Sequence, residues 1–427
     1  MIARIKRGAI SYIKDLSLLS TNARLFLLGA FFIGLTFSAF SLLLNLYLRE
    51  RGFGEAFIGR VLSFGAIGIS IVSIPGAILI SRVRLKPILL MSTVLYAVFG
   101  LLTIYAGRDY FILGAYFCAG MMMAFYRIAS APFFMRNSTP RERPYLFSLS
   151  FGIAVMAGVI GSFVFGQLVD IIGDRFAVDS AGAHRLSLTI GILLSLLALI
   201  PFGLLRMPPG IPKSERLVLS RQTLSPLRGI LFRLTIPYVL VGLGAGMIIP
   251  FLNIFFRDRF GQSPEEIGYY FGILNLTMFV GVMVGPILVR KIGMVRTMIY
   301  TQLASIPFML ILAFCYYFPF VVGAFLIRGT LMNMGHPIGN NFAMEMVPRS
   351  HHAIVNALLM FAWTFSWMIS TQLGGWLIEQ YGYTQSLLIP AGLYVLSSVL
   401  YYRYFKKAEQ FTPEGFIIRP EFKIAEL

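Results

Sequence analysis

Two polar residues stand inside otherwise apolar stretches and could do chemistry. Arg127 lies in the run AFYRIASAP, and His336 lies in NMGHPIGN. A guanidinium can bind a carboxylate or phosphate through paired hydrogen bonds, and an imidazole can exchange a proton near neutral pH. Structural roles are the alternatives, with Arg127 bonded to backbone carbonyls and His336 bonded to a neighbouring helix. We predict that Arg127 binds an anionic group and that His336 gates the path or carries a proton.

Other polar and aromatic residues could complete a binding site with this pair. Asn333, His336 and Asn340 recur at a spacing that places them on one face of a helix. The remaining candidates for binding a substrate are Ser41, Asn275, Trp363 and Trp367. The two tryptophans are one helical turn apart, a spacing that helix packing also produces.

Acidic residues are placed differently from these cations. No Asp or Glu falls in the middle of a long apolar run, so the sequence offers no embedded carboxylate for proton coupling. Asp170 and Glu379 lie near the ends of two such runs. We predict that they form a gate, either by pairing with basic residues such as Arg49 and Arg257 or by capping the N-termini of neighbouring helices. A solvated charge pair with no gating role is the alternative.

The elements that must position these residues are membrane helices. The 427 residues are 57% hydrophobic and 13% charged, with a mean hydropathy of +0.79. Soluble domains carry about 25% charged residues, and apolar runs of about 20 residues are typical of membrane-spanning helices. We predict an all-α integral membrane protein with twelve spans, at residues 23–48, 57–80, 87–106, 110–134, 145–168, 186–206, 234–256, 265–289, 295–317, 319–344, 353–378 and 386–403.

The distribution of positive charge predicts the orientation. If the N-terminus is cytoplasmic, 26 of the 36 Lys and Arg residues fall on the cytoplasmic side and seven on the other side. Positive residues are enriched on the cytoplasmic side of membrane proteins. We therefore predict that both termini are cytoplasmic and that the protein resides in the plasma membrane, which is the inner membrane of a bacterial cell. The basic residues before position 22 fit a helix on the membrane surface or a basic tail.

The sequence also repeats itself. Residues 45–59, NLYLRERGFGEAFIG, have a counterpart in residues 253–268, NIFFRDRFGQSPEEIG, and GQLVDIIG at 166–173 resembles GWLIEQYG at 375–382. Arg127 and His336 occupy matching positions of the repeat. We predict a cytoplasmic segment at 1–22, six-helix bundles at 23–206 and 234–403 related by a pseudo-twofold axis, a linker at 207–233 and a cytoplasmic tail at 404–427.

These features resemble the major facilitator superfamily over essentially the full length. Twelve spans in a 6+6 repeat, a basic central loop, and the G-x-x-x-[DE]-x-x-G endings carry the resemblance. It implies two bundles that rock about a central site, and a monomer. Arg127 resembles the arginine of the family's R-x-x-Q-G pattern, although Ser130 and Ala131 replace the Gln-Gly.

The sequence departs from the family at its loop motif, usually G-x-x-x-D-[RK]-x-G-[RK]-[RK]. In the first half Ile80 replaces the aspartate and Val83 replaces the glycine, and in the second half Arg290 replaces the aspartate. The fifth span also lacks the Gly-Pro pair of many drug antiporters. The sequence therefore does not predict the family's usual inner gate.

The leading functional hypothesis is secondary transport of a small organic solute by alternating access, and Arg127 favours an anion. An exporter of drug-like amphipaths, a lipid-moving carrier and a sensor without transport remain alternatives.

An enzyme is not expected, because the paired His351 and His352 have no acidic partner near in sequence and we identify no catalytic residues. We expect no cofactor and no metal site, because Cys118 and Cys315 both lie in apolar runs. Nucleic acid is excluded as a partner because the basic residues sit in short separate loops. The expected partners are a small-molecule substrate and the lipid bilayer.

Overall fold

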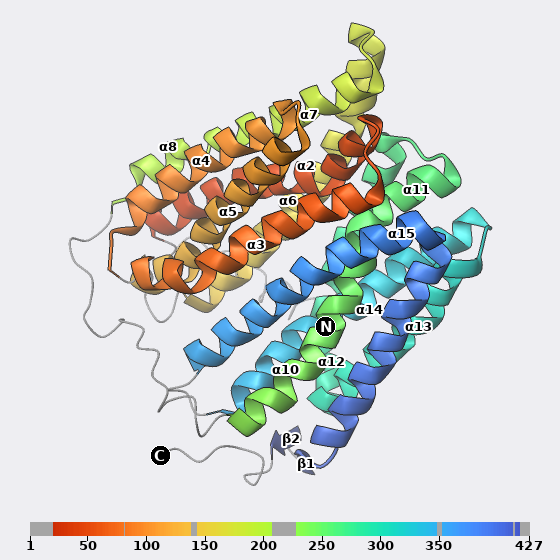
Figure 1. Ribbon diagram of the computed structural model, residues 1–427. Coiled ribbons are helices and arrows are strands. Elements are labelled where there is room, and N and C mark those ends of the chain that lie inside the picture. Colours follow the sequence, from red (N-terminus) through yellow and green to blue (C-terminus); the bar gives the residue numbers. More distant parts are fainter. Residues whose placement is uncertain are drawn as a thin grey trace, which may run out of the picture.

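The computed structural model describes residues 20–80, 82–137, 143–206, 228–347, 352–412 and 415–418. The predicted N-terminal surface segment up to residue 19, residues 207–227 of the predicted linker, His351 and residues 419–427 of the predicted tail lie outside this part of the chain. Helices dominate the described residues, as Figure 1 shows.

The helices form two bundles that lie side by side in Figure 1. The first bundle contains α2 (Thr21–Glu50), α3 (Glu55–Ile80), α4 (Leu85–Tyr105), α5 (Asp109–Asn137), α6 (Arg143–Phe176), α7 (Ser180–Leu196) and α8 (Leu199–Leu204). The second contains α10 (Arg228–Ile248), η2 (Ile249–Phe251), α11 (Leu252–Phe260), α12 (Pro264–Ile292), α13 (Met294–Phe314), α14 (Phe318–Glu345) and α15 (His352–Phe405).

The number of membrane segments follows from these bounds. Eleven helices of the described chain are long and apolar enough to cross a membrane. The last of them is 48 residues long and contains a break at Gly382, where φ is +77°. Only glycine adopts this conformation readily, so Gly382 divides α15 into two segments. The described helices are therefore consistent with the twelve predicted spans.

Apolar side chains are distributed as a lipid environment requires. Large side chains such as Ile71, Met91 and Leu102 are more than half exposed on the outside of the bundles. Exposing such side chains to water would cost free energy, whereas contact with lipid tails does not. Serine and threonine hydroxyls inside the bundles bond mainly to carbonyls, as Thr36 does to the Gly191 oxygen at 2.6 Å. The fold is thus an all-α membrane bundle, as predicted.

Several element bounds differ from the sequence-based ones. Helix α10 begins at Arg228, six residues inside the predicted linker, and α6 continues to Phe176, so Asp170 is a helical residue. The predicted tail contains a short antiparallel hairpin of β1 (Glu409–Thr412) and β2 (Gly415–Ile418).

The hairpin is attached to the second bundle through Glu409. Its carboxylate accepts hydrogen bonds from the backbone amides of Met294 (2.6 Å) and Val295 (3.2 Å), at the start of α13. Burial raises the pKa of Glu409, and these two amides and Arg296 act in the opposite direction. A carboxylate from the tail thus occupies the end of the loop in which Arg290 replaces the family's aspartate.

Candidate transport site: a symmetric clasp and a central cavity

The two repeated segments, residues 45–59 and 253–268, bind each other across the two bundles. Asn45 on α2 donates a hydrogen bond to the Pro250 carbonyl (2.5 Å), and Asn253 on α11 donates one to the Leu42 carbonyl (2.7 Å). Both asparagines are almost fully buried, at 4% and 1% exposure. The Pro250 carbonyl is available because a 3-10 turn interrupts the helix between α10 and α11. Since Leu42 and Pro250 match in the repeat, the two hydrogen bonds are related by the pseudo-twofold axis.

The charges one turn further along pair in the same reciprocal way. The guanidinium of Arg49 lies 3.2 Å from the Asp258 carboxylate, and Arg257 forms an ion pair with Glu50. Arg49 also lies 3.6 Å from Glu55. We call the two asparagines and these four charged residues (Arg49, Glu50, Arg257 and Asp258) the clasp. The clasp joins the two bundles at the end of the molecule that the charge distribution predicts to face outward.

The other two arginines of the repeated segments, Arg51 and Arg259, make contacts within their own bundle. Arg51 donates to the Ala106 carbonyl (2.9 Å) at the end of α4. Its repeat partner Arg259 donates to the Leu312 and Ala313 carbonyls (3.0 and 3.1 Å) at the end of α13. Both contacts lie within one bundle, so these arginines fix the clasp residues to their own half.

Asp170 and Glu379 lie at helix N-termini of the opposite bundle. Glu379 accepts a hydrogen bond from the backbone amide of Ala56 (2.8 Å) in the first turn of α3. The Asp170 carboxylate interacts with the backbone amide of Glu265 and the side chain of Ser263 at the start of α12. A carboxylate is stabilised there by free amides and by the helix dipole. Of the two predicted arrangements, the structure has helix capping rather than pairing with Arg49 or Arg257.

Glycines let the same helices touch backbone to backbone. A Cβ at Gly59 of α3 would lie 2.4 Å from the Thr371 carbonyl of α15, and a Cβ at Gly268 of α12 would lie 2.4 Å from the Ser162 carbonyl of α6. Gly59 and Gly268 match in the repeat, as do the two carbonyls they meet. The closed clasp therefore depends on missing side chains as well as on paired charges.

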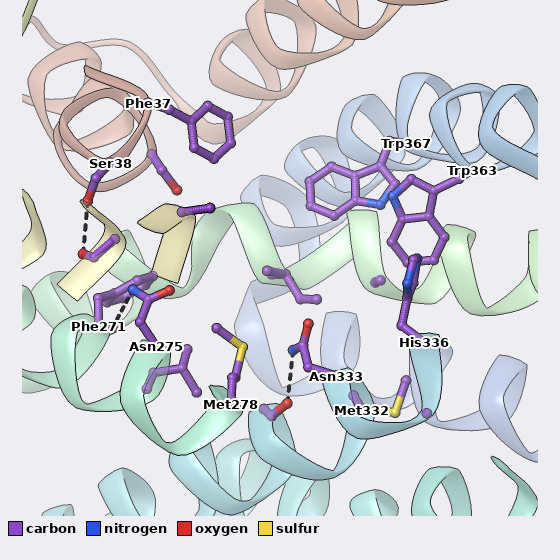
Figure 2. Close-up of a pocket in the computed structure, with 18 of the residues that line it drawn as sticks. Phe37, Ser38, Phe271, Asn275, Met278, Met332, Asn333, His336, Trp363 and Trp367 are labelled. Atoms are coloured by element: carbon purple, nitrogen blue, oxygen red, sulfur yellow. Dashed lines mark hydrogen bonds between the residues drawn. The ribbon is translucent and has the colours of Figure 1, made fainter. Parts of the chain in front are cut away.

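Beside the clasp, a cavity of about 570 Å³ lies between the bundles. Leu42, Leu252 and Phe325 line it near the clasp, and its wall extends away from the clasp to Ala30 and Tyr401. Figure 2 shows that labelled side chains from both bundles surround a common space. Among the described residues of the wall there is no Asp or Glu, whereas Arg127, Arg328 and His336 are all present.

Arg127 is exposed to this cavity. Its guanidinium carbon lies 5.3 Å from the centre of the Phe37 ring on α2, a cation–π contact. Within the described part of the chain, the guanidinium has no hydrogen-bond or ion-pair partner. The side chain is thus held in place by an aromatic face while its donors are available to a solute.

His336 belongs to an aromatic cluster in the second bundle. Its Nε2 lies 3.0 Å from the Tyr238 hydroxyl of α10. The imidazole meets the Trp363 ring edge-to-face, with 5.3 Å between ring centres, and Trp363 lies 6.2 Å from Trp367. Figure 2 shows Trp363 directly beside His336. These rings give the cavity a flat apolar wall with an imidazole at its edge.

The smaller predicted residues are mostly in the wall as well. Ser41, Asn275 and Asn333 line the cavity, and each asparagine amide donates to a carbonyl of its own helix at 2.9 Å (Figure 2). Asn340 does not line it. The last α14 residue that lines the cavity is Gly339, and Asn340 follows it along the helix.

The wall also contains Phe37, Tyr238 and Arg328, which are not among the site residues predicted from the sequence. Phe37 and Tyr238 are aromatic residues in apolar spans, where nothing distinguishes them from lipid-facing rings. Arg328 could have been selected, because an arginine inside a predicted span is itself a signal of function.

Comparison with known proteins agrees with this architecture. The family model of the Major Facilitator Superfamily matches residues 26–236 and 234–421. No curated protein matches the sequence. A crystal structure of a point mutant of the nucleoside transporter NupG superposes with a TM-score of 0.75 at 15% identity, over 90% of this chain and 100% of that one.

Two further structures show how widely the fold is shared. A bacterial homologue of the human lysosomal transporter Spinster, inward-facing and occupied, gives a TM-score of 0.77 at 12% identity, over 90% of this chain and 96% of that one. A D-xylose–proton symporter gives 0.69 at 16% identity, over 92% and 98%. Because the family model spans both bundles, the chain belongs to the Major Facilitator Superfamily of membrane transporters.

Proposed function

We propose that this transporter carries a small organic anion across the membrane by alternating access. The main support is the accessible guanidinium of Arg127, which has no ion-pair partner among the described residues, in a cavity whose described wall contains no carboxylate. A permanent cation at membrane depth is costly, and such residues usually serve a substrate or ion path. A carboxylate or phosphate of the solute would supply the missing counter-charge through charge-assisted hydrogen bonds.

The rest of the wall indicates what else the anion contains. Phe37, Met278, Met332, Trp363 and Trp367 present rings and thioethers to the cavity (Figure 2). Adaptable apolar surface of this kind suits a solute with an apolar or aromatic body. The solved relatives are named for a nucleoside and for D-xylose, but at 12–16% identity they show only the fold. The side chains of the cavity, and not these relatives, support the substrate class.

The clasp supports the alternating-access part of the proposal. It joins the bundles at one end, and the cavity wall extends toward the other end. With the clasp on the outer side, as the charge distribution predicts, this is an inward-facing state. We propose a plasma-membrane location with cytoplasmic termini. Tags at residues 1 and 427 that were accessible from opposite sides would contradict this topology.

His336 is proposed to titrate during transport. Its neighbours in the cavity are the Tyr238 hydroxyl and the Trp363 ring, neither of which fixes its charge at neutral pH. Uptake measured against pH in His336→Gln should lose an inflection that the wild type shows. An unaltered profile would assign His336 to structure alone.

The anion proposal is tested by counterflow in proteoliposomes with a panel of labelled organic anions. Arg127→Gln should lower the transport of any hit at least about 30-fold, corresponding to about 2 kcal/mol, and Arg127→Lys should keep part of it. Arg60→Gln is the matched control, because Arg60 also lies over a phenyl ring (Phe57, 5.5 Å) but does not line the cavity. Full transport by Arg127→Gln would overturn the proposal, and binding without counterflow would favour a sensor.

A further inference from the structure

A second cation in the cavity wall is unexplained by the Arg127 site. Arg328 on α14 is only 2% exposed and lines the same cavity from the opposite bundle. One terminal nitrogen donates to the Tyr394 hydroxyl at 3.0 Å, whereas its Nε is buried without a partner in the described chain. Buried cations are normally matched by a carboxylate or by a full set of acceptors. Among the described residues, the hydrogen-bond partner of Arg328 is one tyrosine hydroxyl.

A second unmatched donor belongs to the same bundle. The indole Nε1 of Trp367 on α15 is also buried without a partner in the described residues, and Trp367 lines the cavity. Both Nε of arginine and Nε1 of tryptophan can only donate. Leaving a buried donor unmatched costs about 1–3 kcal/mol. Such groups in a native cavity indicate that a ligand supplies the acceptors in another part of the working cycle.

The cavity therefore lacks two acceptor groups, one for each bundle. Arg127 has free donors on the side of α5, and Arg328 and Trp367 each have an unmatched donor on the side of α14 and α15. A single small carboxylate bound at Arg127 leaves the second set unmatched. We infer that the solute carries two separated anionic groups, joined by an apolar spacer that lies among the aromatic and methionine side chains. This inference rests on the proposed function and specifies its substrate class.

The two anchors would also connect binding to the motion of the bundles. A dianion held by Arg127 and by the Arg328–Trp367 pair bridges both halves, so its full binding energy is available only when the halves stand at the correct separation. A monoanion contacts one half strongly and lacks this dependence.

The test uses purified full-length protein and two matched probe series. Straight-chain monocarboxylates and α,ω-dicarboxylates from four to ten carbons are titrated by calorimetry, together with the corresponding mono- and diphosphonates. At the best-fitting length the dianion should bind at least tenfold more tightly than the monoanion. Arg127→Gln should weaken both probes.

Variants of the second anchor discriminate between binding and structural roles. Trp367→Phe keeps a ring and removes only the donor, and it should reduce the ratio of dianion to monoanion affinity about tenfold, as should Arg328→Gln. Trp376→Phe, on the exposed surface, controls for a general effect of the substitution.

The outcomes separate the two proposals. Equal affinity for mono- and dianions at every length, with loss of both in Arg127→Gln, would overturn the two-anchor inference and leave the anion carrier standing. An unchanged ratio in both Trp367→Phe and Arg328→Gln would also overturn it. If neither series binds the wild type, the anion proposal itself fails.

Discussion

The clasp and the cavity are built from matching positions of the same repeat, yet they obey opposite rules. In the clasp each position has kept its chemical class, with Glu50 matched by Asp258. Asn45 and Asn253 therefore make equivalent hydrogen bonds, and the ion pairs Arg49–Asp258 and Glu50–Arg257 mirror each other. In the cavity the matching residues Arg127 and His336 differ in charge, shape and partners.

The difference has a physical cause. A contact between two copies related by a twofold axis must be self-complementary, so each residue type is fixed by its own copy. A solute need not share this symmetry, so the two walls that hold it are free to diverge. Conservation of the repeat within one chain therefore distinguishes residues that bind the other half from residues that we propose to bind cargo.

The largest effect is expected from exchanging the cavity residues. The double variant Arg127→His with His336→Arg keeps composition and net charge but moves the cation away from Phe37 and into the Tyr238–Trp363 cluster. Counterflow of the anion should fall about 100-fold or more, equivalent to about 2.7 kcal/mol. An exchange variant that transports normally would show that the two walls are interchangeable, contrary to the comparison.

Filling a glycine contact should have the next largest effect. Gly268→Val or Gly59→Val places methyl groups against a carbonyl that a Cβ would already approach to 2.4 Å, so the closed clasp should lose about 1–3 kcal/mol. A cysteine at Ser41, with Cys118 and Cys315 changed to serine, reports opening through its labelling by an impermeant maleimide on intact cells. Labelling should rise at least tenfold in both variants. Gly114→Val, where the space around the added Cβ is open, should not change it.

Removing one clasp hydrogen bond should have a smaller effect that is equal on the two sides. Asn45→Ala and Asn253→Ala each leave one buried carbonyl with one acceptor site unfilled, at a cost of about 1 kcal/mol. The same maleimide labelling should rise about fivefold in either variant and remain at the wild-type level in Asn356→Ala, an exposed control. Effects that differed tenfold between the two asparagines would argue against a symmetric clasp.

The ion pairs should contribute least, because their side chains are 20–35% exposed. Reversing one partner in Arg49→Asp should increase maleimide labelling about twofold, in line with about 0.5 kcal/mol for a partly exposed pair. The double variant Arg49→Asp with Asp258→Arg should restore the wild-type level. If this double variant does not restore the wild-type labelling, the main partner of Arg49 is Glu55, which lies 3.6 Å away.

Much of the fold could be predicted because its signals are local. Apolar length predicts each helix, and the repeat of NLYLRERGFG predicts two halves. What the sequence could not supply was the pairing across the halves. Nothing in the residue types indicates that Asp170 and Glu379 cap α12 and α3 rather than bind Arg49 or Arg257, because that choice depends on which helix ends meet after folding.

The cavity was predictable to a similar extent. Arg127, His336 and the two tryptophans stand out because polar or bulky groups are unusual in a span. Asn340 shares a helix face with Asn333, as the spacing predicts, but it follows Gly339, the last α14 residue that lines the cavity. A spacing rule identifies a face and does not show where along the helix the cavity ends. Phe37 and Tyr238 could not be found at all, because a phenyl or phenol ring facing lipid and one facing a cavity look the same in sequence.

The reciprocal hydrogen bonds of Asn45 and Asn253 have an evolutionary consequence. An interface in which residue i of one bundle meets residue j of the other, and j meets i, is what two identical six-helix subunits would form about a true dyad. A gene encoding only one bundle would already have specified both sides of this closure. Fusion of two such genes would add no new contact there, and it would release the remainder of each copy to vary independently.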